Sequence, residues 1–219
     1  VSPNAGPIAG GTSVTITGSN FTGATAVTFG GSAATGITVV NATTITATTP
    51  AHAVGTVDIV VTTPAGSGTG SNLYTYAAAP TVSSVSPTAG PTAGGTSVTI
   101  TGTNLTGASA VTFGGSAATG ITVVNATTIT ATTPAHAAGQ VDVVVTTPGG
   151  TGTASNAYSY VPAPTVTSIS PVAGPTAGGT SVTITGTNFT GASAVTFGGS
   201  AAASYTVDSA TQITATTPA

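Results

Sequence analysis

Charge is almost absent from this sequence. It contains no lysine, no arginine and no glutamate, and its acidic side chains are Asp58, Asp142 and Asp208. A typical soluble domain has about a quarter of its residues charged. Binding to nucleic acid and attraction to anionic lipid both depend on lysine and arginine. The composition therefore excludes nucleic acid as a partner, and it excludes electrostatic attachment to a membrane surface.

Cysteine and long apolar runs are absent as well. Without cysteine no disulfide can brace the chain, so each domain must be held together by its own core. No apolar run approaches the roughly 18 residues of a membrane-spanning helix, and no signal peptide is visible. We therefore expect no membrane insertion by this segment.

One decapeptide occurs three times without a change. AGGTSVTITG occupies residues 9–18, 93–102 and 177–186, which gives a period of 84 residues. The identity extends further, because residues 22–53 match residues 106–137 at every position but one. Solenoid repeats have about 20–45 residues, whereas independent domains have about 50–250. The period therefore predicts a tandem array of small domains.

Within each repeat, apolar and polar residues alternate with period two, and glycine and proline separate the runs. This pattern predicts about seven short strands per repeat, as in an immunoglobulin-like β-sandwich. Gly10 and Gly11 are expected to form a turn, and Gly18 is expected to end a strand. In the first repeat, Val27 and Phe29 are predicted to point inward. Three further sets are predicted to share one face of their strand, namely Val14 with Ile16, Val57 with Ile59 and Val61, and Tyr74 with Tyr76.

The period divides the chain into domains at residues 1–79, 80–163 and 164–219. The first domain lacks part of its N-terminal strand, and the third reaches Ala219 before the residues that should supply its last strands. A sandwich without those strands exposes sheet edges and part of its core. We expect the chain to continue beyond Ala219. Completion by strands of a neighbouring molecule is the alternative.

Three motifs recur in every repeat. They are the opening P-x-x-G-P-x-x-G-G-T, the step V-T-I-x-G-x-N-F (with leucine last in the second repeat) and the turn V-x-F-G-G. They lie within Pro3–Gly31, Pro87–Gly115 and Pro171–Gly199. This combination resembles the IPT/TIG immunoglobulin-like domain over essentially the whole chain. The resemblance implies tandem immunoglobulin-like β-sandwiches, and near-identical copies with few charges are most similar to the arrays of bacterial cell-surface proteins.

No catalytic, cofactor-binding or metal site is expected. His52 and His136 occupy the same repeat position, and each repeat adds one aspartate, whereas a metal site usually needs three or four close ligands. We interpret both histidines as loop residues copied with the repeat. The segments between domains contain no acid that could bind calcium. No G-x-S-x-G motif is present, so we expect that the chain is not an enzyme.

Five N-x-S/T sequons are possible glycan acceptors. Their use depends on the glycosylation machinery of the cell. Three of them also belong to the turn motif of the family that the chain resembles, so their asparagines have a structural explanation too. The five residues are Asn20, Asn41, Asn104, Asn125 and Asn188.

Two functions remain open from the sequence. The first is a non-enzymatic structural protein outside the cell, a segment of a cell-surface stalk, fibre or filament that self-associates with copies of the same chain, because its surface lacks repelling charges. The second is an adhesin module whose domains bind glycan or another cell surface directly. Carbohydrate sites usually have exposed aromatic residues, whereas most aromatic residues of this chain fall at core positions, with Tyr205 as the unusual one. We therefore assign any such ligand to an unseen tip domain.

Overall fold

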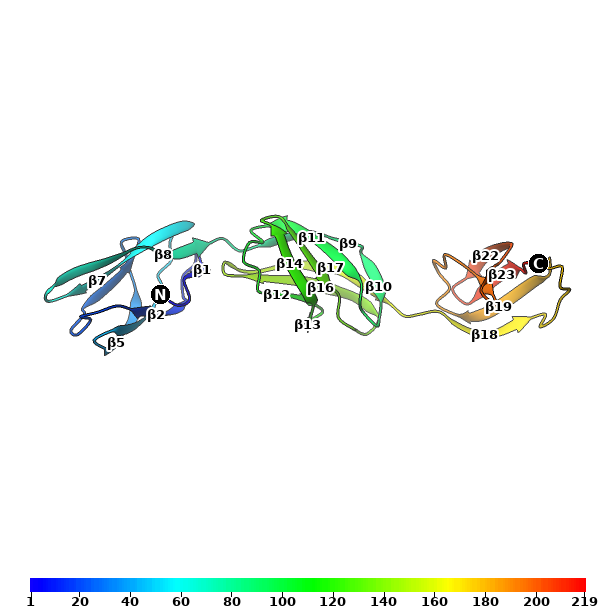
Figure 1. Cartoon of the computed structure of the whole chain (residues 1–219), viewed down its shortest axis with the longest axis horizontal. Coiled ribbons are helices and arrows are strands. Elements are labelled where there is room, and N and C mark those ends of the chain that lie inside the picture. The colour runs from blue at the N-terminus through cyan, green and yellow to red at the C-terminus, as the bar shows by residue number, and fades with distance from the viewer. The chain divides into compact units, whose positions relative to one another are not determined.

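Alternating β-branched and small residues favour strands throughout this chain, because such side chains fit a pleated sheet with one buried face. The computed structural model describes residues 1–219, and all of its regular elements are strands. The chain forms two compact units, Val1–Tyr160 and Val161–Ala219 (Figure 1). The prediction of an all-β fold is confirmed.

Unit 1 contains two sandwich repeats, and unit 2 contains a third. Repeat 1 consists of β1 (Ala5–Pro7), β2 (Ser13–Thr17), β3 (Ala26–Phe29), β4 (Ser32–Ala33), β5 (Thr35–Asn41), β6 (Thr44–Thr48), β7 (Gly55–Thr63) and β8 (Gly66–Ala77). Repeat 2 consists of β9 (Thr81–Ser86), β10 (Ala89–Pro91), β11 (Ser97–Thr103), β12 (Ala110–Phe113), β13 (Ser116–Ala117), β14 (Thr119–Asn125), β15 (Thr128–Thr132), β16 (Gly139–Thr147) and β17 (Gly150–Val161). Unit 2 consists of β18 (Thr165–Ser170), β19 (Ser181–Thr187), β20 (Thr196–Phe197), β21 (Ser200–Ala201), β22 (Ser204–Ser209) and β23 (Gln212–Thr216).

Repeat 2 shows the complete sandwich. One sheet has the strand order β14-β15-β11-β9 and the other has the order β10-β17-β16-β12-β13. Ile100 lies opposite Ile129 in the first sheet, and Val111 lies opposite Val145 in the second. The inner faces of both sheets meet in one buried apolar cluster. The expected strands are all present. Two short strands are additional: β10 forms where the chain passes from one sheet to the other, and β13 forms where it turns back after β12.

Repeat 1 has the same architecture, with the sheets β2-β6-β5 and β1-β8-β7-β3-β4. An isolated bridge between Ser2 and Thr15 lies where β9 pairs with β11 in repeat 2. Val27 and Phe29, which were predicted to point inward, are buried, and so are all the residues of the three predicted common faces. The core is therefore built mainly by strand residues that follow the period-two pattern, with Phe21 added from the loop after β2, and no disulfide contributes.

The chain turns at Ile8 and Ala9, just before the double glycine, and the N–H of Gly10 closes this turn by donating to the carbonyl oxygen of Pro7. Gly10 and Gly11 have φ angles of 71° and 83°, a left-handed conformation that other residues adopt only with strain. The two positions differ in the space around them. A Cβ on Gly10 would meet the carbonyl group of Pro50, whereas a Cβ on Gly11 would meet nothing. The first glycine is therefore required for close packing as well as for backbone conformation.

The expectation that Gly18 ends its strand is correct for repeat 1 and wrong for the other two. In repeat 2, β11 runs through Gly102 to Thr103, and in unit 2 the strand β19 likewise runs through Gly186. The reason is the additional pairing with β9, which extends the strand through a register shift at Gly102. A Cβ on Gly102 would collide with the carbonyl oxygen of Thr81. The glycine thus permits a close approach of two backbones.

Unit 2 retains one sheet of the sandwich, with the order β18-β19-β23-β22. The other sheet is reduced to the two strands β20 and β21, because unit 2 contains no counterpart of β16 and β17. Ile169 is 39% exposed, whereas Val85 at the same position of repeat 2 is 4% exposed. One inner face of this unit is therefore open, as expected for a sandwich without its last strands. None of the segments forms a helix with the length and apolarity that a membrane crossing requires.

Candidate functional site

The two histidines pack against the tyrosine cores of repeats 1 and 2. The ring of His52 is stacked on that of Tyr76, with ring centroids 5.0 Å apart, and His136 is stacked on Tyr160 in the same way. The Nδ1 atom of His52 lies 2.9 Å from the carbonyl oxygen of Ala53. No group of three or more His, Asp, Glu or Cys side chains is placed to hold a metal ion. The histidines therefore complete an aromatic stack.

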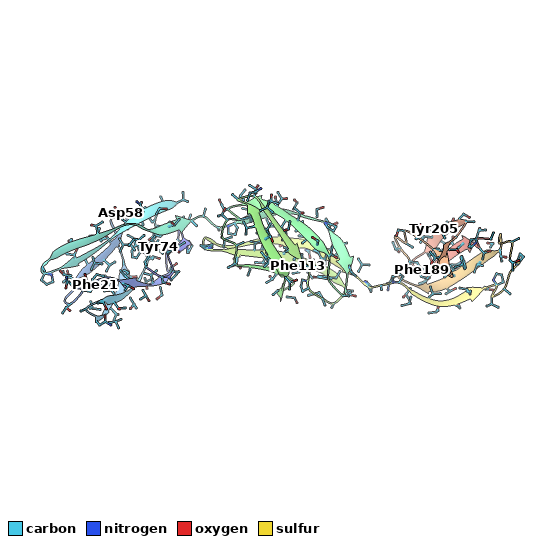
Figure 2. The ribbon with its side chains drawn as sticks, in the orientation of Figure 1. Phe21, Asp58, Tyr74, Phe113, Phe189 and Tyr205 are labelled. Atoms are coloured by element: carbon cyan, nitrogen blue, oxygen red, sulfur yellow. The ribbon has the colours of Figure 1, made fainter.

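That stack extends through the sandwich. In repeat 1, Phe29 meets Tyr74 edge to face at 5.3 Å, and Tyr74 meets Tyr76 in the same manner at 5.0 Å. Figure 2 labels Tyr74 within repeat 1. Burial raises the pKa of Tyr76 to about 12, and the neighbouring Tyr74 adds to this effect. The Tyr76 hydroxyl is therefore neutral at physiological pH, so it does not serve as a base there.

The acidic residues of repeats 1 and 2 stabilise a bulge in a hairpin. Oδ1 of Asp58 accepts a hydrogen bond of 2.8 Å from the backbone N–H of Asn72, and Asp142 accepts the same bond from Asn156. The register of β7 and β8 shifts at this point, between Val57 and Ile59. This role was not predicted from the sequence. The signal was the pair of aspartate and asparagine that recurs 14 residues apart in both repeats.

Asp208 in unit 2 belongs to a different structural position. It lies in β22, and its Oδ2 accepts a hydrogen bond of 2.7 Å from Oγ1 of Thr214. In repeats 1 and 2 the same position holds Val40 and Val124, which are 57% and 56% exposed. The three carboxylates therefore lie apart in the fold, each with its own local partner, and form no acidic cluster.

Three of the five predicted glycan acceptors lie at turns with a left-handed backbone. Asn20, Asn104 and Asn188 have φ angles of 58°, 55° and 58°. The amide of Asn104 donates a hydrogen bond of 3.0 Å to the carbonyl oxygen of Ala79, and Asn188 donates one of 3.2 Å to Ala163. Each of these bonds ties the loop that follows β11 or β19 to the segment that precedes the first strand of the same repeat.

The other two predicted acceptors end an edge strand. Oδ1 of Asn41 accepts hydrogen bonds from the backbone N–H of Thr43 at 2.8 Å and from its hydroxyl at 2.9 Å. Asn125 has the same two bonds with Thr127. All five asparagine side chains are exposed to solvent. Their modification remains a prediction.

Two hollows differ in chemical character. In repeat 2, an open groove of about 530 Å³ lies between β9, β10 and β17, and its polar lining includes Ser83, Gln140 and Asn156. No aromatic or charged side chain lines this groove. In unit 2, a hollow of about 460 Å³ is lined mainly by apolar side chains of the open inner face. Tyr205 is 37% exposed on the same unit, and its hydroxyl donates to the carbonyl oxygen of Ala192 (Figure 2).

Comparison with known families gives one result for all three repeats. A family model described as IPT/TIG domain matches residues 1–76, 80–160 and 164–219. A search of curated proteins finds no match.

Several solved structures are similar to the chain. The full extracellular region of plexin A4 is 27% identical with a TM-score of 0.53, and the match covers 100% of this chain and 20% of that one. SGBP-B from a complex xyloglucan utilization locus in Bacteroides uniformis is 25% identical with a TM-score of 0.37, with coverages of 85% and 55%. A surface glycan-binding protein from Prevotella bryantii is 21% identical with a TM-score of 0.35, with coverages of 69% and 37%. The chain thus spans a fifth to about half of the lengths of these structures.

Proposed function

The chain belongs to the IPT/TIG domain family in all three repeats, and on this basis we propose that it is a non-enzymatic structural segment of an extracellular stalk, fibre or filament. In this function the domain is repeated to give length, and the outer surfaces of the repeats associate with copies of the same chain. The tandem order of near-identical domains is the feature that such a segment needs.

The observation that carries this proposal is that the tyrosine, histidine and aspartate side chains of unit 1 have structural roles. The tyrosines are buried and the half-buried histidines stack on them, and the aspartates hold hairpin bulges. No reactive side chains remain in a shared cavity with the mutual geometry that catalysis requires. What these repeats present to solvent is a nearly uncharged surface rich in threonine.

The neutral surface also supports self-association. Charged proteins of one sign repel each other, and a net charge near zero promotes association. This chain has a formal net charge of −3 from three aspartates in 219 residues. The extracellular setting is supported by the similarity to the extracellular region of plexin A4.

The second candidate function is an adhesin module that binds glycan or another cell surface directly. The polar groove of repeat 2 favours it, because hydroxyl and amide groups that carry no charge suit neutral sugars. Aromatic platforms are missing from this groove, which weakens that candidate relative to a structural segment. A ligand bound by a tip domain elsewhere in the molecule is compatible with the structural proposal.

The two candidates are separated by titration of the purified chain with an array of neutral oligosaccharides. A structural segment predicts no saturable binding, together with assembly that increases with protein concentration. Saturable binding that is lost in a Gln140→Ala, Asn156→Ala double variant would support the adhesin module. A monomeric chain at all concentrations would contradict the self-association proposed here.

A further inference from the structure

One sheet of repeat 1 turns a face of hydroxyl groups to solvent. In the sheet β2-β6-β5, Val14, Ile16 and Ile45 are buried, so the residues that alternate with them lie on the outer side. The residues of β2 and β5 on this side are exposed, and those of β6 are half-buried. We call this surface the hydroxyl face. Cross-strand pairing arranges it in three rows, which are Ser13 with Thr48 and Thr35, Thr15 with Thr46 and Thr38, and Thr17 with Thr44 and Asn41.

Repeat 2 has the same face at the same positions of its sheet β14-β15-β11-β9. The rows are Ser97 with Thr132 and Thr119, Thr99 with Thr130 and Thr122, and Thr101 with Thr128 and Asn125. The rows of both repeats consist of serine, threonine and asparagine, and they contain no charged residue. The chain therefore presents the same uncharged face twice.

The carboxylates of the two complete repeats lie on the other sheet. Asp58 is in β7 and Asp142 is in β16, and each is exposed between two buried neighbours. Each sandwich thus has one outer face that carries a carboxylate and one that carries none. Contact between two hydroxyl faces brings no like charges together, whereas contact between two of the other faces does.

Unit 2 shows that one position of the hydroxyl face accepts a charge without loss of the strand. Asp208 occupies the position of Val40 and Val124, and β22 still pairs with β23. Its Oδ2 accepts a hydrogen bond from Oγ1 of Thr214, which is the counterpart of Thr46 in the central row. This position therefore lies beside the central row. In repeats 1 and 2 its valine is more than half exposed and adds apolar surface to the face.

We propose that the hydroxyl faces of repeats 1 and 2 are the surfaces through which copies of this chain associate, with one hydroxyl face packed on that of a second copy. The inference rests on the proposed self-association and names the surface that performs it. A threonine hydroxyl both donates and accepts hydrogen bonds, so a second copy of the face offers every group that the first one needs. The threonine methyl groups and the exposed valines are removed from water in the same contact.

The test compares two double variants of the 219-residue chain that gain the same negative charge on different sheets. Val40→Asp with Val124→Asp places it beside the hydroxyl faces, where unit 2 already tolerates an aspartate. Thr56→Asp with Gln140→Asp places it at exposed positions of β7 and β16 in the other sheet. Unit 2 is unaltered in both variants, so its contribution to association is equal. Thermal unfolding followed by circular dichroism checks that both variants fold.

Sedimentation equilibrium measures the association of the unaltered chain and of both variants. The first variant is expected to weaken association about tenfold or more, because like charges would be buried in the contact. The second variant is expected to associate nearly as the unaltered chain does. Equal association of the two variants would overturn the hydroxyl face as the surface and leave self-association in place. An unaltered chain that stays monomeric would overturn both.

Hydrogen exchange of the unaltered chain separates contact between faces from pairing between strand edges. Face-to-face contact leaves the outer backbone groups of the edge strands β5 and β14 unpaired, so their amide exchange is expected to change little on association. Strong protection of these amides in the associated chain would show that copies join through their strand edges, and it would overturn the proposal.

Discussion

At the scale of single residues, the decapeptide contains two adjacent glycines with similar backbone angles and unequal surroundings. In repeat 2 these are Gly94 and Gly95, with φ angles of 73° and 82°. A Cβ at Gly94 would strike the carbonyl group of Pro134, while a Cβ at Gly95 would meet open space. The pair therefore separates the cost of backbone strain from the cost of a collision.

We predict that Gly95→Ala lowers the free energy of unfolding of repeat 2 by about 1 kcal/mol, because alanine is strained in the left-handed region. Gly94→Ala is expected to cost more, since the neighbouring backbone must also move. Native-state hydrogen exchange of repeat 2 measures both effects, and the unaltered repeat 1 in the same molecule is the control. Equal costs at the two positions would contradict the packing role of Gly94.

Asp142 provides a second test at this scale. Asp142→Ala removes the acceptor of the Asn156 N–H, so repeat 2 is expected to lose about 1 kcal/mol of stability. The loss is modest because the side chain is exposed to solvent. Asp142→Asn keeps an oxygen acceptor and is expected to retain most of the stability. The measurement is the exchange rate of the Asn156 amide hydrogen. An unchanged rate in Asp142→Ala would mean that the hydrogen bond does not hold the bulge.

The sequence predicted the inward residues of repeat 1 because burial in a strand follows a local period of two. It did not predict the roles of Asp58 and His52. Their partners, Asn72 and Tyr76, lie 14 and 24 residues away, and they meet only through the register of β7 and β8. A role that depends on pairing between strands is not visible in a local pattern.

At the scale of elements, the hairpins β7–β8 and β16–β17 carry the tyrosine pairs that close the core. Burial raises the pKa of Tyr76 to about 12 and also raises the pKa of Tyr160. An unfolded tyrosine has a pKa of about 10. The folded state therefore binds the phenolic proton more tightly than the unfolded state does. This contribution to stability is complete below about pH 10 and is lost as the pH rises toward about 12.

We predict that the urea midpoint of unfolding falls as the pH rises from about 9 to about 12. A Tyr76→Phe, Tyr160→Phe double variant lacks both raised groups, so its midpoint is expected to change less over this range. Circular dichroism follows the transition in both proteins. If the midpoints of the two proteins fall in parallel, the buried hydroxyls are not the cause.

Strand positions were largely predictable, and strand endings were not. The alternation located every long strand of repeat 2. The expectation that the last glycine of the decapeptide ends its strand is wrong at Gly102, because β11 continues through this residue. The continuation comes from pairing with β9, which approaches closely because Gly102 has no side chain. Similarly, β20 has two residues and β12 has four, although residues 194–197 and 110–113 have the same sequence. The strand is shorter in unit 2 because no hairpin pairs with it there.

At the scale of the whole molecule, the proposed self-association depends on the outer surfaces of the repeats. An uncharged, threonine-rich surface gives little electrostatic repulsion, so association should depend weakly on salt. Charged side chains placed on this surface should oppose association. Thr38 and Thr122 lie at equivalent positions of the edge strands β5 and β14 and are exposed. A Thr38→Lys, Thr122→Lys variant is therefore expected to assemble less than the unaltered chain, with unchanged stability of the core.

The most direct measurement is sedimentation velocity of the purified 219-residue chain over a wide concentration range, at low and high salt. We expect species larger than the 20.2 kDa monomer that grow with concentration, change little with salt and diminish in the lysine variant. A single monomeric species at every concentration would contradict the claim that the surfaces of this array associate.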